Sequence, residues 1–206
     1  MSSNISIYNE DSLQALKAMQ DKQFDLAIVD PPYGIGANKE KPHNGWKDYG
    51  IKHWDNKTPD ETFFNELRRV SKNQIVWGAN YMTTYLPPSM GWIFWDKGQR
   101  NFSLADGELA YTSFDKALRV FEYSRAKSNQ ENKIHATQKP VDLYKWLLKN
   151  YAEPGSKILD THLGSGSIAV ACYDMGFDLT AYEIDKEYYE AACKRLENHK
   201  KQLTLW

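Results

Sequence analysis

Apolar and polar stretches alternate along the chain in a way that predicts strands and helices in regular succession. Short apolar runs of the kind found in buried parallel strands recur, at residues 4–8, 24–29, 74–77, 92–95, 157–160 and 179–183. Segments with apolar side chains every three or four residues predict helices between them, at residues 11–19, 58–70, 141–151, 168–175 and 186–199. Thr58 is the expected N-cap of the second of these helices. This succession predicts an α/β fold with a doubly wound, mostly parallel sheet and right-handed crossovers.

Two stretches interrupt the pattern. Residues 31–57 are rich in Gly, Pro, Asn, Lys and Trp and show no period, so we expect a mobile loop beside a functional site. Residues 124–137 are polar and irregular and predict a second loop. Between these stretches we expect a short helical piece around residues 81–86 and a hairpin of residues 109–112 and 118–123.

Length and composition limit the class of protein. With 206 residues, of which 41% are hydrophobic, we expect a single domain over residues 1–206. The two cysteines, Cys172 and Cys193, lack the spacing of a disulfide framework or a zinc site, so we expect no metal. No apolar stretch approaches the roughly 20 residues of a membrane helix, and the first residues do not resemble a secretory signal. These features predict a cytoplasmic protein.

A glycine-containing turn joins the strand at residues 157–160 to the next helix. Its glycines allow a ligand close to the backbone, and the helix start offers free amide donors. Glu183 ends the next predicted strand, about 20 positions on, where dinucleotide-type folds hold a ribose diol. Asp185 is the expected N-cap of the last helix. No Gly-Lys-Ser/Thr follows the turn, so a nucleoside ligand without a triphosphate fits it better.

The tetrapeptide Asp30-Pro31-Pro32-Tyr33 follows the apolar strand at residues 24–29 directly. Carboxyl ends of parallel strands share one edge of a sheet, so Asp30 belongs beside the glycine turn. The prolines fix the backbone and remove two donors. The Asp30 carboxylate and the Pro31 carbonyl then accept the two hydrogens of a planar amine, while its ring stacks on Tyr33. This arrangement aims the nitrogen lone pair at an electrophile, and positioning supplies most of the rate.

These motifs resemble those of the DNA amino-methyltransferases, which methylate adenine N6 or cytosine N4. Asp30 to Tyr33 resembles the catalytic tetrapeptide of that family, and residues 160–167 resemble its cofactor turn, usually Asp-Pro-Phe-x-Gly-Ser-Gly-Thr. Residues 135–140 resemble its His-Pro-Thr-Gln-Lys-Pro segment. The tetrapeptide precedes the turn, as in the circularly permuted beta class, and the short chain is similar to small orphan or phage members. The resemblance implies the Rossmann-like class I methyltransferase fold.

The resemblance implies S-adenosyl-L-methionine as the cofactor. The residues that it places around this cofactor are Asp11, Asp30, Thr137, Gln138, Lys139, Asp160, His162, Gly164, Ser165, Gly166, Ser167 and Glu183. Asp11 is also the expected N-cap of the first helix. Thr161, His162 and Ala136 stand where the family has Pro, Phe and Pro, and the planar His162 can pack against the cofactor as the Phe does.

DNA is the partner that the resemblance implies, with a flipped target base because a base inside a duplex cannot reach such a pocket. The net charge is only -1, so contacts to phosphates must come from local patches. We expect these contacts within residues 31–57 and within a short recognition region at residues 99–134. The candidates are Lys39, Lys41, Lys47, Trp46, Arg100 and Arg119. A homodimer is common in the resembling subgroup, and membership of a restriction-modification system stays open.

Three readings of the function follow. Asp30 favours adenine N6 as the target, because cytosine N4 enzymes of this family more often begin the tetrapeptide with Ser. Cytosine N4 methylation is the alternative. An alternative of another class is a non-catalytic, cofactor-binding partner subunit, which the intact tetrapeptide disfavours. Methylation of a protein glutamine is disfavoured by the Asp at position 30 and by the permuted order.

Overall fold

The computed structural model describes residues 3–36, 52, 54–101, 104–130, 134–135 and 137–203. The strands are β1 (Ile5–Tyr8), β2 (Phe24–Val29), β3 (Ser71–Trp77), β4 (Trp92–Asp96), β5 (Gly107–Thr112), β6 (Arg119–Glu122), β7 (Lys157–Asp160) and β8 (Asp178–Tyr182). The α-helices are α1 (Ser12–Ala18), α2 (Glu61–Val70), α3 (Arg125–Gln130), α4 (Val141–Tyr151), α5 (Ser167–Met175) and α6 (Lys186–Leu203). Two short 3-10 turns, Ala79–Tyr81 and Thr83–Tyr85, follow β3.

All the strands lie in one sheet of order β1-β8-β7-β2-β3-β5-β4-β6. Strands β1, β8, β7, β2 and β3 are parallel to one another, whereas β5 is antiparallel to both β3 and β4. The predicted mostly parallel α/β sheet is therefore confirmed. Strands β7 and β2, far apart in the sequence, lie side by side, with Leu26 opposite Ile158.

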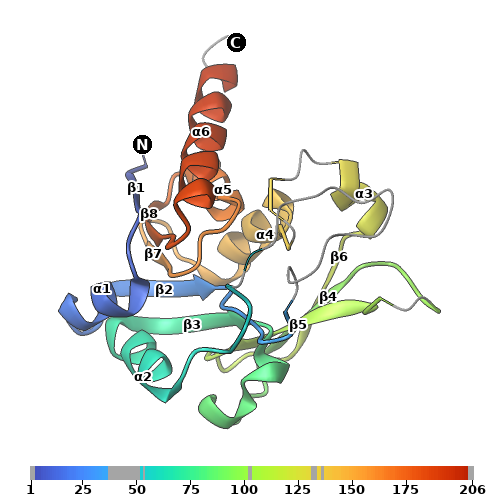
Figure 1. The fold of residues 1–206 in the computed structure, drawn as a ribbon. Helices are drawn as coiled ribbons and strands as arrows, with labels where there is room; N and C mark the ends of the chain where they lie inside the picture. Colours follow the sequence, from blue (N-terminus) through green and yellow to red (C-terminus); the bar gives the residue numbers. More distant parts are fainter. Residues whose placement is uncertain are drawn as a thin grey trace.

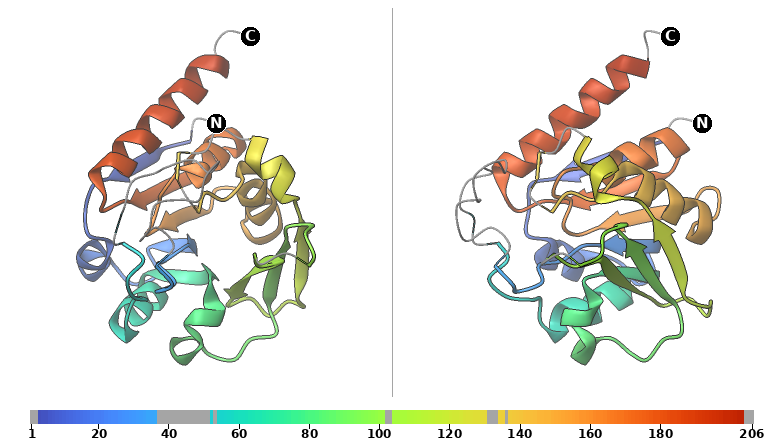
Figure 2. Two further views of the ribbon diagram at one scale, coloured as in Figure 1. Left: turned by 45° about the vertical axis from the view of Figure 1, so that its right-hand side comes forward. Right: turned by 90° about the vertical axis from the view of Figure 1, so that its right-hand side faces the viewer.

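Helices cover both faces of the sheet (Figure 1). Alternate residues of β2 divide between two apolar cores, because successive side chains of a strand point to opposite faces. Leu26 and Ile28 pack in the core formed with α4 and α5, and Ala27 and Val29 pack in the core formed with α1 and α2. Helix α6 packs against the first of these cores and extends beyond the sheet toward the C-terminus (Figure 2). Within the described residues, no helix combines the length and apolarity needed to cross a membrane.

Helix α2 begins later than the sequence pattern predicts. Thr58 was the expected N-cap, but Asp60 is the N-cap, and its carboxylate accepts a hydrogen bond from the backbone N–H of Phe63. Asp60 has the extended backbone of a cap residue and an acceptor three positions before the N–H that it satisfies. The Thr58 prediction is wrong because Asp60 provides this cap instead.

The predicted hairpin of residues 109–112 and 118–123 is also wrong. Strand β4 lies between β5 and β6 and pairs with both. The reason is burial, because Ile93 and Trp95 of β4 belong inside the sheet while Val120 of β6 is about half exposed at its edge. The irregular segment after β6 contains the short helix α3 instead of loop alone.

Candidate active site

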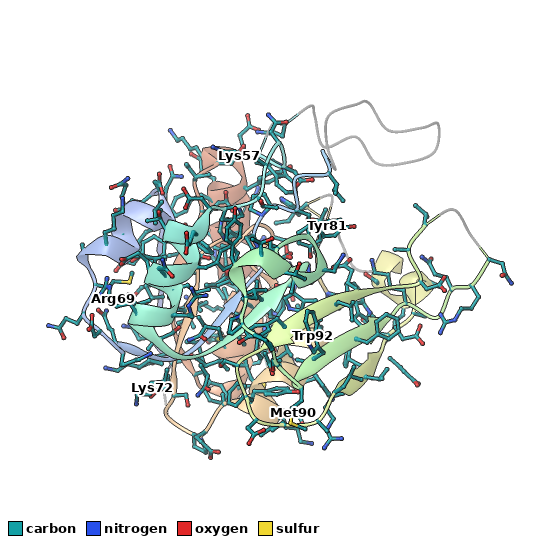
Figure 3. The ribbon with its side chains drawn as sticks, turned by 90° about the horizontal axis from the view of Figure 1, so that it is seen from below. Lys57, Arg69, Lys72, Tyr81, Met90 and Trp92 are labelled. Carbon is teal, nitrogen blue, oxygen red and sulfur yellow. The ribbon has the colours of Figure 1, made fainter. Side chains whose placement is uncertain are left out.

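The carboxyl ends of four parallel strands bring the predicted site residues to one edge of the sheet. Asp11 follows β1, Glu183 follows β8, His162 follows β7 and Asp30 follows β2. Figure 3 shows Tyr81, which lies beyond the end of β3, toward one end of the molecule and Lys72, near the start of β3, toward the other. This edge is where ligands of doubly wound sheets bind.

A cavity of about 300 Å³, here called the cofactor cavity, opens at the ends of β7, β8 and β2. Its wall includes Asp30, residues 137–139, His162, Gly164, Ser165 and Glu183. Glu183 is buried, and its two carboxylate oxygens accept hydrogen bonds from the backbone N–H groups of Gly164 (2.8 Å) and Asp185 (2.9 Å). Burial raises the pKa of Glu183. The structure therefore brings most of the predicted cofactor residues together around one hollow.

Four of the predicted cofactor residues lie outside the wall of this cavity. Asp160 is buried and accepts a hydrogen bond from the His162 backbone N–H at 3.0 Å, and burial raises its pKa to about 8. Gly166 faces α6, where a Cβ atom would lie 3.0 Å from the Cβ atom of Ala192. The Ser167 hydroxyl lies 3.0 Å from the Ser165 hydroxyl. These three residues support the glycine turn from the side away from the cofactor cavity.

Asp11, the fourth, caps α1 by accepting a hydrogen bond from the Leu13 backbone N–H at 2.8 Å, as predicted. Asp185 likewise caps α6 through the backbone N–H groups of Glu187 and Tyr188. A direct contact of Asp11 with the cofactor stays a prediction.

His162 forms an apolar part of the cofactor cavity wall. Its ring meets the ring of Phe63 edge-on, with 5.4 Å between their centroids. Burial lowers the pKa of His162 to about 4, so its ring is neutral near pH 7. A neutral, planar ring in this position fits the packing role predicted for it.

The segment that resembles the family's His-Pro-Thr-Gln-Lys-Pro motif closes one side of the cofactor cavity. His135 lies between Trp54 and Tyr188, with ring centroids 5.2 Å and 4.3 Å away. The Gln138 side-chain carbonyl accepts a hydrogen bond from the Ile134 backbone N–H, while its buried amide nitrogen has no partner in the described structure. This unused donor in the cavity wall fits a polar ligand.

A second cavity of about 470 Å³, here called the base cavity, adjoins the first. Asp30, Trp54 and Thr137 line both cavities, so the two hollows meet at the tetrapeptide. The Tyr33 ring stacks on Tyr81 with 5.3 Å between centroids and an interplanar angle of 17°. Tyr33 also lies against Gly78, where a Cβ atom would be 2.0 Å from a Tyr33 ring carbon. An aromatic wall of this kind fits a planar ring system.

The backbone of the tetrapeptide is held by Asp55, which the sequence did not indicate. The buried Asp55 carboxylate accepts hydrogen bonds from the backbone N–H groups of Tyr33 (2.6 Å) and Gly34 (2.8 Å). The Gly36 backbone N–H donates to the Asp55 carbonyl at 3.0 Å. Asp55 therefore accepts hydrogen bonds from the two backbone amides that follow the prolines, and these bonds fix the backbone of the tetrapeptide.

Charges of both signs surround the Asp30 carboxylate. Lys139 Nζ lies 2.5 Å from one of its oxygens, and the Tyr33 hydroxyl donates to the other at 2.7 Å. Lys139 also lies 3.1 Å from Glu108, which in turn lies 2.5 Å from Lys97 Nζ. Burial raises the pKa of Asp30, and the adjacent Lys139 ammonium opposes this rise.

The family model described as DNA methylase, N6_N4_Mtase, matches residues 76–194, which is more than half of the chain. The chain belongs to this DNA methylase family. The match spans the Glu108 strand, the segment at residues 135–140 and the glycine turn, so it includes residues of both cavities, while Asp30 to Tyr33 precede it.

Curated relatives of the methylase extend over nearly all of its length. The type II methyltransferase M.HpaI of Haemophilus parainfluenzae is 27% identical over 91% of this chain and 72% of its own. The DNA adenine methyltransferase YhdJ of Escherichia coli K12 is 24% identical over 93% of this chain and 82% of its own.

Solved structures show the same fold as the methylase. The complex of M1.HpyAVI with S-adenosylmethionine superposes with a TM-score of 0.62 at 19% identity, covering 93% of this chain and 98% of the other. The cytosine-N4-specific PvuII DNA methyltransferase gives 0.64 at 14% identity, covering 98% and 92%.

The residues predicted to bind DNA either do not line the two cavities of the methylase or fall outside the described residues. Arg100 pairs with Asp96 through two hydrogen bonds of 2.9 Å and 2.6 Å. Arg119 is exposed at the start of the edge strand β6. The predictions for Lys39, Lys41, Trp46 and Lys47 fall outside the described residues, as does most of the predicted loop 31–57. The predicted recognition region 99–134 contributes β5 and β6 to the sheet, and its contact with DNA stays a prediction.

Besides Asp55, two further charged residues of the base cavity were missed as site residues. Lys97 directly follows β4, as Asp30 follows β2, and Glu108 lies near the start of β5. The strand-end position of Lys97 was the available signal. Among the described residues, no group of His, Cys, Asp and Glu side chains is arranged to hold a metal ion.

Proposed function

We propose that this methylase transfers a methyl group from S-adenosyl-L-methionine to the N6 amine of a flipped adenine in DNA. The observation that carries the proposal is the meeting of two cavities at Asp30. One has the turn and acidic strand end that suit a nucleoside, and the other has an aromatic wall that suits a base. A methyl donor bound in the first cavity and a base bound in the second would meet at Asp30, which lines both cavities.

The cofactor cavity fits S-adenosylmethionine by the chemistry of its wall. Glu183 offers carboxylate lone pairs for a ribose diol, as predicted for an acid at this strand end. His162 offers a flat, neutral surface, and Gln138 offers an amide donor that has no protein partner. When bound, S-adenosylmethionine supplies an electrophilic methyl group, whose bond to sulfur breaks as the bond to nitrogen forms, with the electron pair remaining on sulfur.

The tetrapeptide binds and orients the amine. One N–H of the amine donates to the Asp30 carboxylate and the other to the Pro31 carbonyl, which holds the nitrogen lone pair toward the cofactor cavity. Lys139 and the Tyr33 hydroxyl keep the carboxylate in place. After transfer the nitrogen releases one proton to solvent water, so the product is a neutral secondary amine. Positioning of this kind supplies a large part of the rate when the leaving group is good.

Adenine is the proposed target for two reasons. The tetrapeptide begins with Asp30, and the relative YhdJ is named as a DNA adenine methyltransferase. The base must leave the duplex to reach the base cavity. DNA in the bacterial cytoplasm is the proposed substrate, and pairing of two chains on it remains an expectation of the resemblance.

Transfer of label tests the proposal. The protein is incubated with S-adenosylmethionine labelled in the methyl group and with unmethylated plasmid DNA, and the nucleosides are then identified by mass spectrometry. We expect label in N6-methyladenine. Label in N4-methylcytosine selects the alternative base, and DNA that stays unlabelled while the protein binds the cofactor favours the non-catalytic reading.

A further inference from the structure

In addition to Asp30, a pair of oppositely charged residues, Lys97 and Glu108, lines the base cavity. Lys97 follows β4 and Glu108 lies in β5, and these strands are antiparallel neighbours with Trp95 opposite Glu108. Both side chains line the base cavity. Their position is set by the sheet itself, which is more rigid than a loop.

Lys97 is held in one orientation by two contacts. Its Nζ atom lies 2.5 Å from Glu108 Oε1 and 4.8 Å from the centroid of the Trp95 ring. The Lys97 side chain is 17% exposed and that of Glu108 is 23% exposed. The adjacent Lys139 and Lys97 lower the pKa of Glu108 to about 2. Glu108 therefore remains charged and keeps its ion pair with Lys97.

Charges alternate across the site from Asp30 through Lys139 and Glu108 to Lys97. Lys139 is almost completely buried and lines the cofactor cavity only. Lys97 is therefore the one cation among the described residues that line the base cavity. An ammonium group has three N–H donors, so a donor remains for a ligand beside the bond to Glu108.

The base cavity holds a hydrogen-bond acceptor, the Asp30 carboxylate, and a hydrogen-bond donor, the Lys97 ammonium group. These two groups match the edge of adenine. The adenine amine is bonded to C6, and the adjacent ring nitrogen N1 is a hydrogen-bond acceptor. Thymine and guanine carry a protonated ring nitrogen on the corresponding edge, which faces an ammonium group with donor against donor. Cytosine carries an amine beside the unprotonated N3, so this contact excludes thymine and guanine, and the preference for adenine over cytosine rests on the tetrapeptide. Enzymes that flip a base read it by hydrogen bonds to this Watson–Crick edge.

We propose that Lys97 is a specificity-determining residue that donates a hydrogen bond to ring nitrogen N1 of the flipped adenine, with Glu108 as its positioning residue. This inference rests on the proposed function. It deepens that function because it assigns recognition of the ring to the end of β4, while Asp30 and Pro31 hold the amine. Loss of one such hydrogen bond costs about 10- to 100-fold in discrimination.

Base analogues test the contact directly. The wild-type protein and Lys97→Met are compared on duplexes that carry adenine, 1-deazaadenine or 7-deazaadenine at the target position, in a sequence taken from the methylated plasmid. For the wild-type protein, kcat/KM on 1-deazaadenine is expected to fall about 10- to 100-fold relative to adenine. For Lys97→Met, kcat/KM on adenine is already low, and 1-deazaadenine causes no such further fall.

Two controls separate the contact from a general loss of structure. Lys97→Arg keeps a donor and is expected to keep the preference for adenine over 1-deazaadenine, and 7-deazaadenine should lower kcat/KM by the same factor in wild type and Lys97→Met. If 1-deazaadenine lowers kcat/KM equally in wild type and Lys97→Met, the Lys97 contact is overturned while the proposed function stands. If the wild type fails to methylate the unmodified duplex, the proposed function itself fails.

Discussion

At the scale of single residues, the site depends on carboxylates placed one position after the end of a strand. Asp30 and Glu183 both follow buried apolar strands, and both were predicted from that position together with the tetrapeptide and the spacing from the glycine turn. Glu108 was not, because it lies near the start of a strand, although its side chain lines the base cavity between Lys139 and Lys97. Glu108 lies beside Lys97 because β5 pairs with β4. The sequence pattern of a single strand does not show which strand pairs with it.

Glu183→Ala is expected to weaken binding of S-adenosylmethionine. The change removes both the proposed ribose acceptor and the bonds to the Gly164 and Asp185 amides. Hydrogen bonds to a charged group contribute about 1.5–3 kcal/mol, so the dissociation constant should rise about 10- to 100-fold. Isothermal titration calorimetry measures this change. Glu153→Ala, at an exposed position, is the matched control, and equal affinity in both variants contradicts the assignment.

At the scale of elements, local patterns predicted where the strands lie along the chain, but not the order of β5, β4 and β6 in the sheet. Strand β2 and helix α4 have the predicted bounds, because each carries an unbroken apolar pattern. The pairing of β4 with β6 was missed, because residues 118–123 were expected to pair with residues 109–112, their neighbours along the chain, whereas β4 lies between these two strands. Which strand forms an edge is decided by tertiary packing.

The 3-10 turn after β3 supports the base cavity through Gly78. This glycine has a φ angle of +65°, and a Cβ atom there would lie 2.0 Å from the Tyr33 ring. Gly78→Ala is therefore expected to displace Tyr33 and lower kcat/KM by roughly 10- to 100-fold, as a misplaced positioning group does. Binding of S-adenosylmethionine should change little.

Gly155→Ala provides the matched control for this prediction. Gly155 has a φ angle of +84° but nothing within 4 Å of its added Cβ atom. Both variants carry the backbone cost of about 1–2 kcal/mol for a left-handed residue, and only Gly78→Ala meets the Tyr33 ring. Equal kcat/KM values for the two variants would show that the ring contact has no part in catalysis.

At the scale of the whole molecule, buried titratable groups set how stability depends on pH. Burial raises the pKa of Asp160 to about 8, so the folded protein binds a proton that the unfolded chain releases above about pH 4. The stabilisation of the folded protein by this proton decreases as the pH rises and is lost near pH 8. Burial lowers the pKa values of His135 and His162 to about 4, and their contribution is lost as the pH falls below about 6.5.

We expect the melting temperature to be highest near pH 6.5 and to fall between pH 6.5 and 8 because of Asp160. Asp160→Asn keeps an acceptor for the His162 amide and removes the charge, so it should flatten this fall. Differential scanning calorimetry across this range provides the measurement, with the exposed Asp115→Asn as control. An unchanged slope in Asp160→Asn means that Asp160 is not the group responsible.

The most direct test of the account is a single-turnover measurement of methyl transfer to DNA by Asp30→Ala. Asp30 lies where the two cavities meet, and it is the proposed acceptor for the reacting amine. We predict that the transfer rate falls at least about 100-fold, while the variant still binds S-adenosylmethionine with an affinity within about tenfold of the wild type. Transfer by Asp30→Ala at the wild-type rate would contradict the account.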